Sequence, residues 1–397
     1  MIENCENENL PSNWTLRRIS EISERVSVGF VGITSPHFTD ANNGVPLIRS
    51  QNIRNGKINF QNLAFVTKEF HHKNKKSQLK EGDVIVVRVG ENRGDTCILK
   101  NEFYEANCAN VVFFRPQKGY GKFVELFLRS SIGQHSLISL TTGSAQGVIN
   151  TKSIAELIVP LPPTEEALEI SDLFESIEGK IDLLHRQNKT LEQLAETLFR
   201  QWFVEEAEEG WEVGTLEDEF EFIMGQSPSG ETLNENKEGM IFFQGRSDFG
   251  FRFPEPRVYT TLATRIAKSL DTLVSVRAPV GDINMAFEEC CLGRGVAAFR
   301  YRHKPEFYSY TYYKMRSLAE QIKQFEDCGT VFGSIGKDDF KKLECIIPPN
   351  ELILRFQENV KPIDDKIKSN TKQVSTLTQL RDTLLPKLMN GQVRIEN

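Results

Sequence analysis

Arginine and amide side chains near the ends of strand-like segments are the residues of this sequence best suited to bind a partner. Arginine can form two parallel hydrogen bonds with a guanine edge, and asparagine or glutamine can do the same with adenine. Each such residue alone is compatible with an ordinary surface position, but together they recur at matching points of two segments and predict DNA reading. The candidates are Arg49, Gln51, Asn52, Arg88, Arg93, Asn107, Ser144 and Gln146 in the first segment, and Gln244, Arg246, Ser247, Arg277, Arg294, Thr330 and Ser334 in the second.

Signatures of catalysis are missing from the sequence. It has no GxxxxGK[ST], GxGxxG, HExxH or GxSxG, the motifs of common nucleotide, zinc and acyl-transfer sites. The spacing of Asp83, Glu91 and Arg93 loosely resembles a nuclease carboxylate cluster, but the expected lysine is absent. The pair His71-His72 stands in a basic stretch and predicts a solvated loop better than a metal site. We therefore predict a binding protein with no catalytic residue and no metal ligand.

The charge is distributed unevenly along the chain. The 397 residues carry 48 Lys and Arg against 55 Asp and Glu, a net charge of −7 that at first disfavours a nucleic-acid partner. Residues 13–160, however, hold 19 basic and 12 acidic side chains, whereas residues 161–209 hold 4 and 13. A basic segment thus precedes a strongly acidic one. No apolar run approaches the about 20 residues that span a bilayer, and seven cysteines without a CxxC pair favour a reducing, cytoplasmic location.

An internal repeat sets the plan on which these residues must be positioned. Leu161-Pro162-Pro163 recurs as Ile347-Pro348-Pro349, and at the same spacing of 186 residues IEGKI (177–181) recurs as IDDKI (363–367). Residues 141–154 also resemble residues 327–340 at this spacing. One register kept over some 60 residues indicates a duplicated unit.

Each repeat begins with a region of short strand-like runs and turn signals, and continues after a Pro-Pro stop into a long helical pattern. We therefore predict an α+β fold, with two homologous mixed α/β domains separated by two long helices. The predicted segments are an N-terminal tail (1–12), a first domain (13–160), a first long helix (161–209), a second domain (210–346), and a second long helix with a tail (347–397).

Heptad spacing runs through both helical segments. Four or more regular heptads indicate coiled-coil helices. If the two helices were parallel, the asparagines within their seams would each face an apolar residue, whereas antiparallel helices bring Asn188 and Asn370 into one layer. We predict the antiparallel pair, with this asparagine pair fixing the register; the alternative is that each helix packs on its own domain with its asparagine facing water. The seam positions are Ile170, Phe174, Ile177, Ile181, Leu184, Asn188, Leu191, Ala195, Leu198 and Trp202, and Phe356, Val360, Ile363, Ile367, Asn370, Val374, Leu377, Arg381, Leu384 and Leu388.

This arrangement resembles the specificity subunit of a type I restriction–modification system. Two variable regions, each ending in a PLPP-like stop and a long helix, match that family in layout, and the segment LLPKLMNGQVRI (384–395) is similar to its C-terminal signature. Gly143-Ser144 and Gln146, followed by Ile149-Asn150, also resemble the family pattern. One departure is Glu165-Glu166, where the family usually has Glu-Gln.

The resemblance implies that each domain is a target recognition domain that reads one half of a bipartite, double-stranded DNA site. The helical pair would set the spacer and dock two modification subunits, which bind S-adenosylmethionine and methylate adenine. Restriction subunits, where present, would use ATP and Mg²⁺, so no cofactor is expected in this chain. Three alternatives stay open: a protein–protein scaffold, a metal-dependent enzyme that uses Asp83, Glu91 and Arg93, and the specificity subunit of a type II-like fused system.

Overall fold

The computed structural model describes residues 10–140, 147–302, 304–327 and 333–395. Its contacts divide the chain into two compact units, of which the first comprises residues 1–182 and 375–397 and the second residues 183–374. Each long helix is therefore shared between the units, whereas the sequence-based division set the helices apart as segments of their own. Ser144, Gln146 and Thr330 lie outside the described residues.

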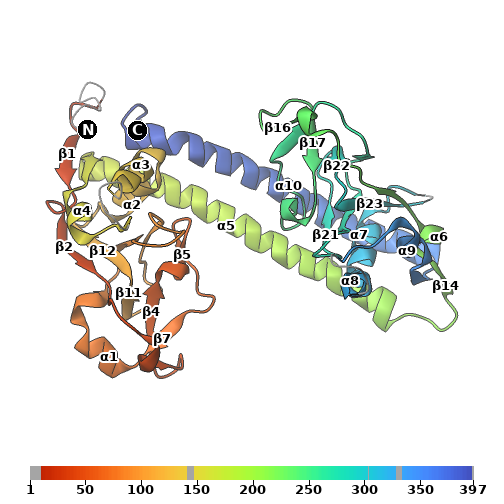
Figure 1. Ribbon diagram of the computed structural model, residues 1–397, viewed down its shortest axis with the longest axis horizontal. Coiled ribbons are helices and arrows are strands. Elements are labelled where there is room, and N and C mark those ends of the chain that lie inside the picture. The colour runs from red at the N-terminus through yellow and green to blue at the C-terminus, as the bar shows by residue number, and fades with distance from the viewer. Residues whose placement is uncertain (1–9, 141–146, 303, 328–332, 396–397) are drawn as a thin grey trace. The chain divides into compact units, whose positions relative to one another are not determined.

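The first unit contains a four-stranded and a five-stranded sheet, together with two short strand pairs (Figure 1). The four-stranded sheet has the order β10-β9-β12-β2, and the five-stranded sheet has the order β3-β7-β4-β11-β8. Its strands are β1 (Thr15–Arg18), β2 (Ser23–Val28), β3 (Phe38–Thr39), β4 (Val45–Arg49), β5 (Ile53–Arg54), β6 (Lys57–Ile58), β7 (Ala64–Val66), β8 (Gln78–Leu79), β9 (Val84–Val87), β10 (Thr96–Ile98), β11 (Ala106–Ala109), β12 (Val111–Pro116) and β13 (Ile158–Leu161). Its shorter helices are α1 (Lys68–Lys73), α2 (Gly121–Arg129), α3 (Ser131–Ser139) and α4 (Thr151–Glu156).

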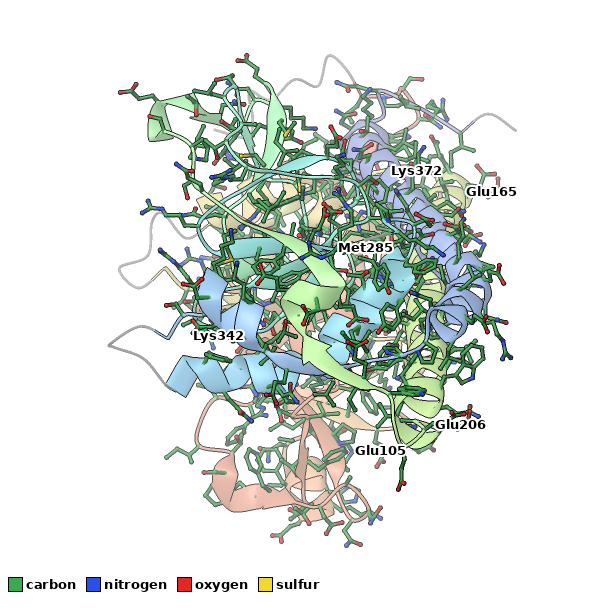
Figure 2. All side chains as sticks on the ribbon, turned by 90° about the vertical axis from the view of Figure 1, so that its right-hand side faces the viewer. Glu105, Glu165, Glu206, Met285, Lys342 and Lys372 are labelled. Atoms are coloured by element: carbon green, nitrogen blue, oxygen red, sulfur yellow. The ribbon has the colours of Figure 1, made fainter. Side chains whose placement is uncertain are left out.

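The second unit has the orders β15-β23-β20-β21 and β16-β18-β17-β22-β19 in its two larger sheets. Figure 2 labels Met285, which is buried in strand β21 (Ile283–Met285), and Lys342, which is exposed at the end of helix α9 (Lys337–Lys342) (Figure 2). The strands are β14 (Glu212–Thr215), β15 (Phe220–Met224), β16 (Leu233–Asn234), β17 (Met240–Phe243), β18 (Val258–Thr260), β19 (Ile266–Ala267), β20 (Thr272–Ser275), β21 (Ile283–Met285), β22 (Cys290–Leu292), β23 (Val296–Tyr301) and β24 (Glu344–Ile347). The shorter helices are α6 (Leu216–Glu219), α7 (Tyr308–Ser317), α8 (Ala319–Asp327) and α9 (Lys337–Lys342).

The two units share one topology. Each strand of the four- and five-stranded sheets in the first unit has a counterpart at the same place in the second, and β4 pairs with β11 in parallel as β17 does with β22. The short outer pairs β1-β13 and β14-β24 also correspond. Strands such as β9, whose four residues are all buried, read as continuous apolar runs because both faces are covered. The predicted duplication and α+β class are confirmed.

The long helices are α5 (Thr164–Arg200) and α10 (Asn350–Met389), each of which begins directly after a Pro-Pro pair. Each seam position predicted from the heptads is buried or half-buried. In the second unit α5 and α10 run antiparallel, because Asn188 contacts Asn370 while Phe199, further along α5, packs on Phe356, earlier in α10. The predicted antiparallel pair is confirmed there. A π-helical turn, Gln201–Glu205, follows α5 and takes in the last seam residue, Trp202.

Each helix also packs on the sheets and shorter helices of its unit. In the first unit Phe174 of α5 and Leu388 of α10 belong to one apolar cluster with Phe123 of α2. In the second unit Phe199 joins a cluster with Tyr310 of α7. Phe199 lies beside the heptad seam and is fully covered, so the heptad pattern understated how much of each helix is buried.

Candidate nucleic-acid interface

Five of the predicted DNA-binding residues in the second unit line one open cleft of about 610 Å³. Gln244 follows β17, Arg277 follows β20 and Arg294 follows β22, so all three side chains start where strands end. The remaining walls come from Ser227, the turn after β17 and Ala278-Pro279. The five are Gln244, Arg246, Ser247, Arg277 and Arg294.

The electrostatics of the cleft are dominated by three exposed guanidinium groups. Arg246 forms an ion pair with Asp282. Within the described part of the chain Arg277 and Arg294 have no carboxylate partner, so their donors are free for a phosphate or a base edge. Ser334, also exposed, pairs with Arg277 through a backbone bridge, so the sixth described candidate lies beside a residue of the cleft lining.

In the first unit four candidates lie at or near the surface. Gln51 is exposed on the turn that follows β4. The guanidinium of Arg49 donates to the carbonyl of Asn62 over 3.1 Å and lies 5.7 Å from the ring centre of Phe38. Arg93 donates to the carbonyl of Gly147 over 2.6 Å. Arg88 is half-buried after β9.

Two candidates of the first unit are corrected by their burial. Asn107 lies within β11, fully covered, and its side chain bonds with the ring of His71 and with the hydroxyl of Ser77. Asn52 is likewise buried, and both ends of its amide bond backbone atoms of the same unit. An amide whose donors and acceptor are already used inside the protein cannot bond with a base edge without breaking those contacts. Neither amide is therefore free to read a base.

Asp83, the first residue of the nuclease-like pattern, is part of a buried ion pair. Arg115 of β12 donates two hydrogen bonds to it, over 2.7 and 2.9 Å. The second unit repeats this pair as Asp271 with Arg300 of β23. Burial raises the pKa of both aspartates, although the arginines act in the opposite direction. Asp83 is held inside the fold while Glu91 is exposed, so the two carboxylates do not form a cluster. The Asp83–Arg115 and Asp271–Arg300 pairs are instead a structural support that is repeated in both units.

The basic stretch that contains His71 and His72 differs from the predicted loop. It forms helix α1, which begins at Lys68 and is capped by the hydroxyl of Thr67. His71 is a buried residue of this helix, with one ring nitrogen at Asn107 and the other 3.7 Å from Glu105. Within the described residues no group of three or more His, Cys, Asp and Glu is arranged to hold a metal ion.

A buried arginine of the second unit was missed by the sequence analysis. Arg252 is 1% exposed and forms ion pairs with Glu192 of α5 and Asp364 of α10. Its guanidinium lies 3.4 Å from the ring centre of Tyr312 and donates to the hydroxyl of Tyr313 over 3.2 Å. Arg252 thus joins both long helices to α7.

One signal in the sequence could have indicated this network. Glu192 directly follows the seam residue Leu191, and Asp364 directly follows the seam residue Ile363. A carboxylate at the same heptad position of both helices needs a cation if that position is buried. Burial indeed raises the pKa of Asp364, while Arg252 acts to lower it.

No helix within the described residues is both long enough and apolar enough to cross a bilayer.

Comparisons with known proteins agree with the duplicated plan. A sequence model of the type I restriction modification DNA specificity domain matches residues 11–193 and again residues 208–379. The putative type I restriction enzyme MjaX specificity subunit of Methanocaldococcus jannaschii is 27% identical, over 98% of this chain and 95% of that protein. The HindI specificity subunit of Haemophilus influenzae is 22% identical, over 96% of this chain and 100% of that protein.

A solved structure shows the same fold. The type I restriction–modification S subunit from M. genitalium has a TM-score of 0.65 at 17% identity, covering 96% of this chain and 97% of that one. Since the two family matches together cover most of the sequence, the chain belongs to the family of type I restriction–modification DNA specificity subunits.

Proposed function

We propose that this member of the family reads a bipartite DNA sequence, with one half-site bound by the domain of residues 13–160 and the other by the domain of residues 210–346. The observation that carries the proposal is the pair of equivalent units, of which the second gathers five predicted base readers around one cleft. Arginine and glutamine at strand ends supply the donors and acceptors that base edges require. The basic first domain adds attraction to phosphate.

We further propose that the paired helices set the spacer between the half-sites. Helix α5 has 37 residues and α10 has 40, which at 1.5 Å per residue corresponds to roughly 55–60 Å for a straight helix. The asparagine pair fixes one register in the seam, and a fixed register is what a spacer requires. The length of the helices and this pair support the role.

The chain itself carries recognition, and catalysis belongs to its partners. Two modification subunits, which bring S-adenosylmethionine and methylate adenine, dock on the long helices, whose outer faces keep apolar side chains such as Leu183, Leu194 and Leu354 exposed. The acidic character of residues 161–209 suits a basic partner surface. Restriction subunits that use ATP and Mg²⁺ complete the system where they are present, unless the subunits are fused as in a type II-like arrangement.

A second candidate function is a scaffold that joins proteins and does not read bases. The net charge of −7 favours it, because the second domain offers less attraction to phosphate than the first. A scaffold gives no sequence-dependent protection of DNA, even when all its partners are present.

The test is reconstitution of the full chain with its modification subunits. The complex should methylate adenine in one interrupted sequence, as single-molecule sequencing of the treated DNA would show. The same partners without this chain serve as the control and should leave that sequence unmodified. Methylation that is scattered without a common sequence would contradict base reading and support the scaffold.

A further inference from the structure

The same short turn follows equivalent strands in the two units. In the first unit the 3₁₀ turn η2 (Ser50–Asn52) follows β4, and in the second the 3₁₀ turn η6 (Arg246–Asp248) follows β17. Strand β4 pairs in parallel with β11, which precedes β12, and β17 pairs in parallel with β22, which precedes β23. The two turns therefore follow equivalent strands of the two units. The first turn carries one exposed candidate base reader, Gln51, and the second carries two, Arg246 and Ser247.

The last residue of each turn is polar and buried. The Oδ1 of Asn52 accepts a hydrogen bond from the backbone N–H of Arg49 over 3.1 Å. The Oδ2 of Asp248 accepts from the backbone N–H groups of Gln244, over 2.7 Å, and Gly245, over 3.3 Å. In both units a side-chain oxygen thus ties the end of the turn back to the end of the preceding strand.

A second tie holds each turn to the segment that follows. The carbonyl of Asn52 accepts from the N–H of Asn59 over 2.6 Å, and the Asn52 amide donates back to the carbonyl of Asn59 over 3.1 Å. The carbonyl of Asp248 accepts from the N–H of Glu255 over 2.8 Å, again seven residues on. In both turns the last residue is therefore bonded to the chain before the turn through its side chain, and to the chain after the turn through its carbonyl.

The two turns differ in the buried residue at their end, which is an amide (Asn52) in the first unit and a carboxylate (Asp248) in the second. A buried carboxylate costs more free energy than a buried amide unless a cation lies beside it. Arg257 supplies that cation, since it pairs with Asp248 and also donates to the carbonyl of Ser247 over 3.1 Å. Arg257 thus holds the turn at two points, Asp248 and the backbone of Ser247. The exposed side chains of Arg246 and Ser247 project from this turn.

We propose that Asn52 and Asp248 are positioning residues for DNA specificity. Asn52 holds the turn that presents Gln51 to one half-site, and Asp248 holds the turn that presents Arg246 and Ser247 to the other. The inference rests on the proposed function but adds that specificity in each half-site depends on a buried residue that does not touch DNA. Base-reading geometry tolerates only small displacements, so a loosened turn loses discrimination before the fold is lost.

The experiment uses the complex of the full chain with its modification subunits and a panel of duplexes in which each base of both half-sites is varied. For N52A we expect the ratio of methylation rates between correct and altered bases to fall on the order of 10-fold to 100-fold in one half-site, with the other half-site unchanged. D248A should give the reciprocal result. D248N, which keeps the acceptor for Gln244 and Gly245, should restore most of the ratio.

The unaffected half-site serves as an internal control for folding. Uniformly slower methylation with unchanged base ratios, or equal loss in both half-sites, would overturn the positioning role and indicate a merely structural one. Selectivity in the wild-type complex is read from the same panel. If the wild-type complex showed no base preference, the proposed function would fail together with this inference, whereas a selective wild-type complex with unaffected variants would overturn this inference alone.

Discussion

The amide of Asn370 donates a hydrogen bond to the side-chain oxygen of Asn188 over 2.9 Å, between two helices whose facing positions are otherwise mainly apolar. Both residues are buried, so the alternative with each asparagine facing water is excluded. Neighbouring polar groups add weaker bonds: Gln187 accepts from Asn370, and Thr371 from Asn188, each over 3.4 Å. These bonds favour the one alignment of the antiparallel helices in which Asn188 faces Asn370.

Replacement of one asparagine should destabilise the second unit. Asn188→Leu leaves the amide of Asn370 without its main partner, which should lower the free energy of unfolding by about 1–3 kcal/mol. The double variant N188L/N370L should recover most of that loss, because both polar groups are then removed. Urea denaturation of the two single variants and the double variant measures the coupling. Strictly additive losses would contradict a direct bond between the two side chains.

Removal of the buried cation at Arg252 should cost more. Arg252→Met leaves Asp364 buried without a counter-charge and Glu192 with Arg316 as its remaining cation, so we expect a loss of about 3–5 kcal/mol in the free energy of unfolding. The triple variant R252M/E192Q/D364N removes the charges together and should be more stable than R252M. A change below about 1 kcal/mol for R252M, measured by urea denaturation, would show that the network adds little to the packing of the helices on α7.

The stability of the first unit should depend on Glu178 in mild acid. Burial alone would raise the pKa of Glu178, but Lys122 and Arg129 outweigh it and hold the pKa of this carboxyl below its ordinary value of 4.5. A lowered folded pKa means that the stabilisation is fully present above the pKa of the unfolded chain and is lost as the pH falls through the folded value.

We therefore expect the wild-type protein to exceed E178Q in stability above about pH 5, with the difference shrinking as the pH is lowered further. Hydrogen exchange of the amides in α2, measured across this range in both proteins, follows the first unit separately. A difference between the two proteins that stays constant with pH would contradict this account.

The arginines of the cleft should act on one half-site only. Arg277→Ala or Arg294→Ala should weaken DNA binding by the reconstituted complex by about 1–3 kcal/mol if the guanidinium contacts a base, with relaxed preference at that base. A phosphate contact would instead weaken binding uniformly and reduce its salt dependence. Binding titrations on duplexes altered in either half-site distinguish the two. R265A, an exposed arginine outside the cleft lining, is the matched control, and an equal effect of all three variants would argue against the cleft.

The sequence predicted the features that repeat at long range and missed those that depend on tertiary contacts. The heptads and the Pro-Pro pairs sufficed for α5, α10 and the contact between Asn188 and Asn370, because regular spacing reports a buried helix face directly. Arg252 could not be placed, since nothing local to it shows that two carboxylates more than 50 residues away converge on it.

Candidate base readers were predicted with uneven success for a related reason. Residue type and strand ends identified Gln244, Arg277 and Arg294, which do gather at one cleft. Asn52 and Asn107 have the same chemistry but are used to hold their own backbone or core. A single sequence does not distinguish an amide that faces solvent from one that caps a turn, because both occur where strands end.

The most direct test of the two-reader account is an exchange of residues 13–160 for the first domain of another family member, with the long helices and residues 210–346 kept. Reconstituted with the modification subunits, the hybrid should methylate a sequence in which one half-site is new while the other half-site and the spacer are unchanged. If both half-sites changed, or if neither did, the account of two separate readers on a common pair of helices would be contradicted.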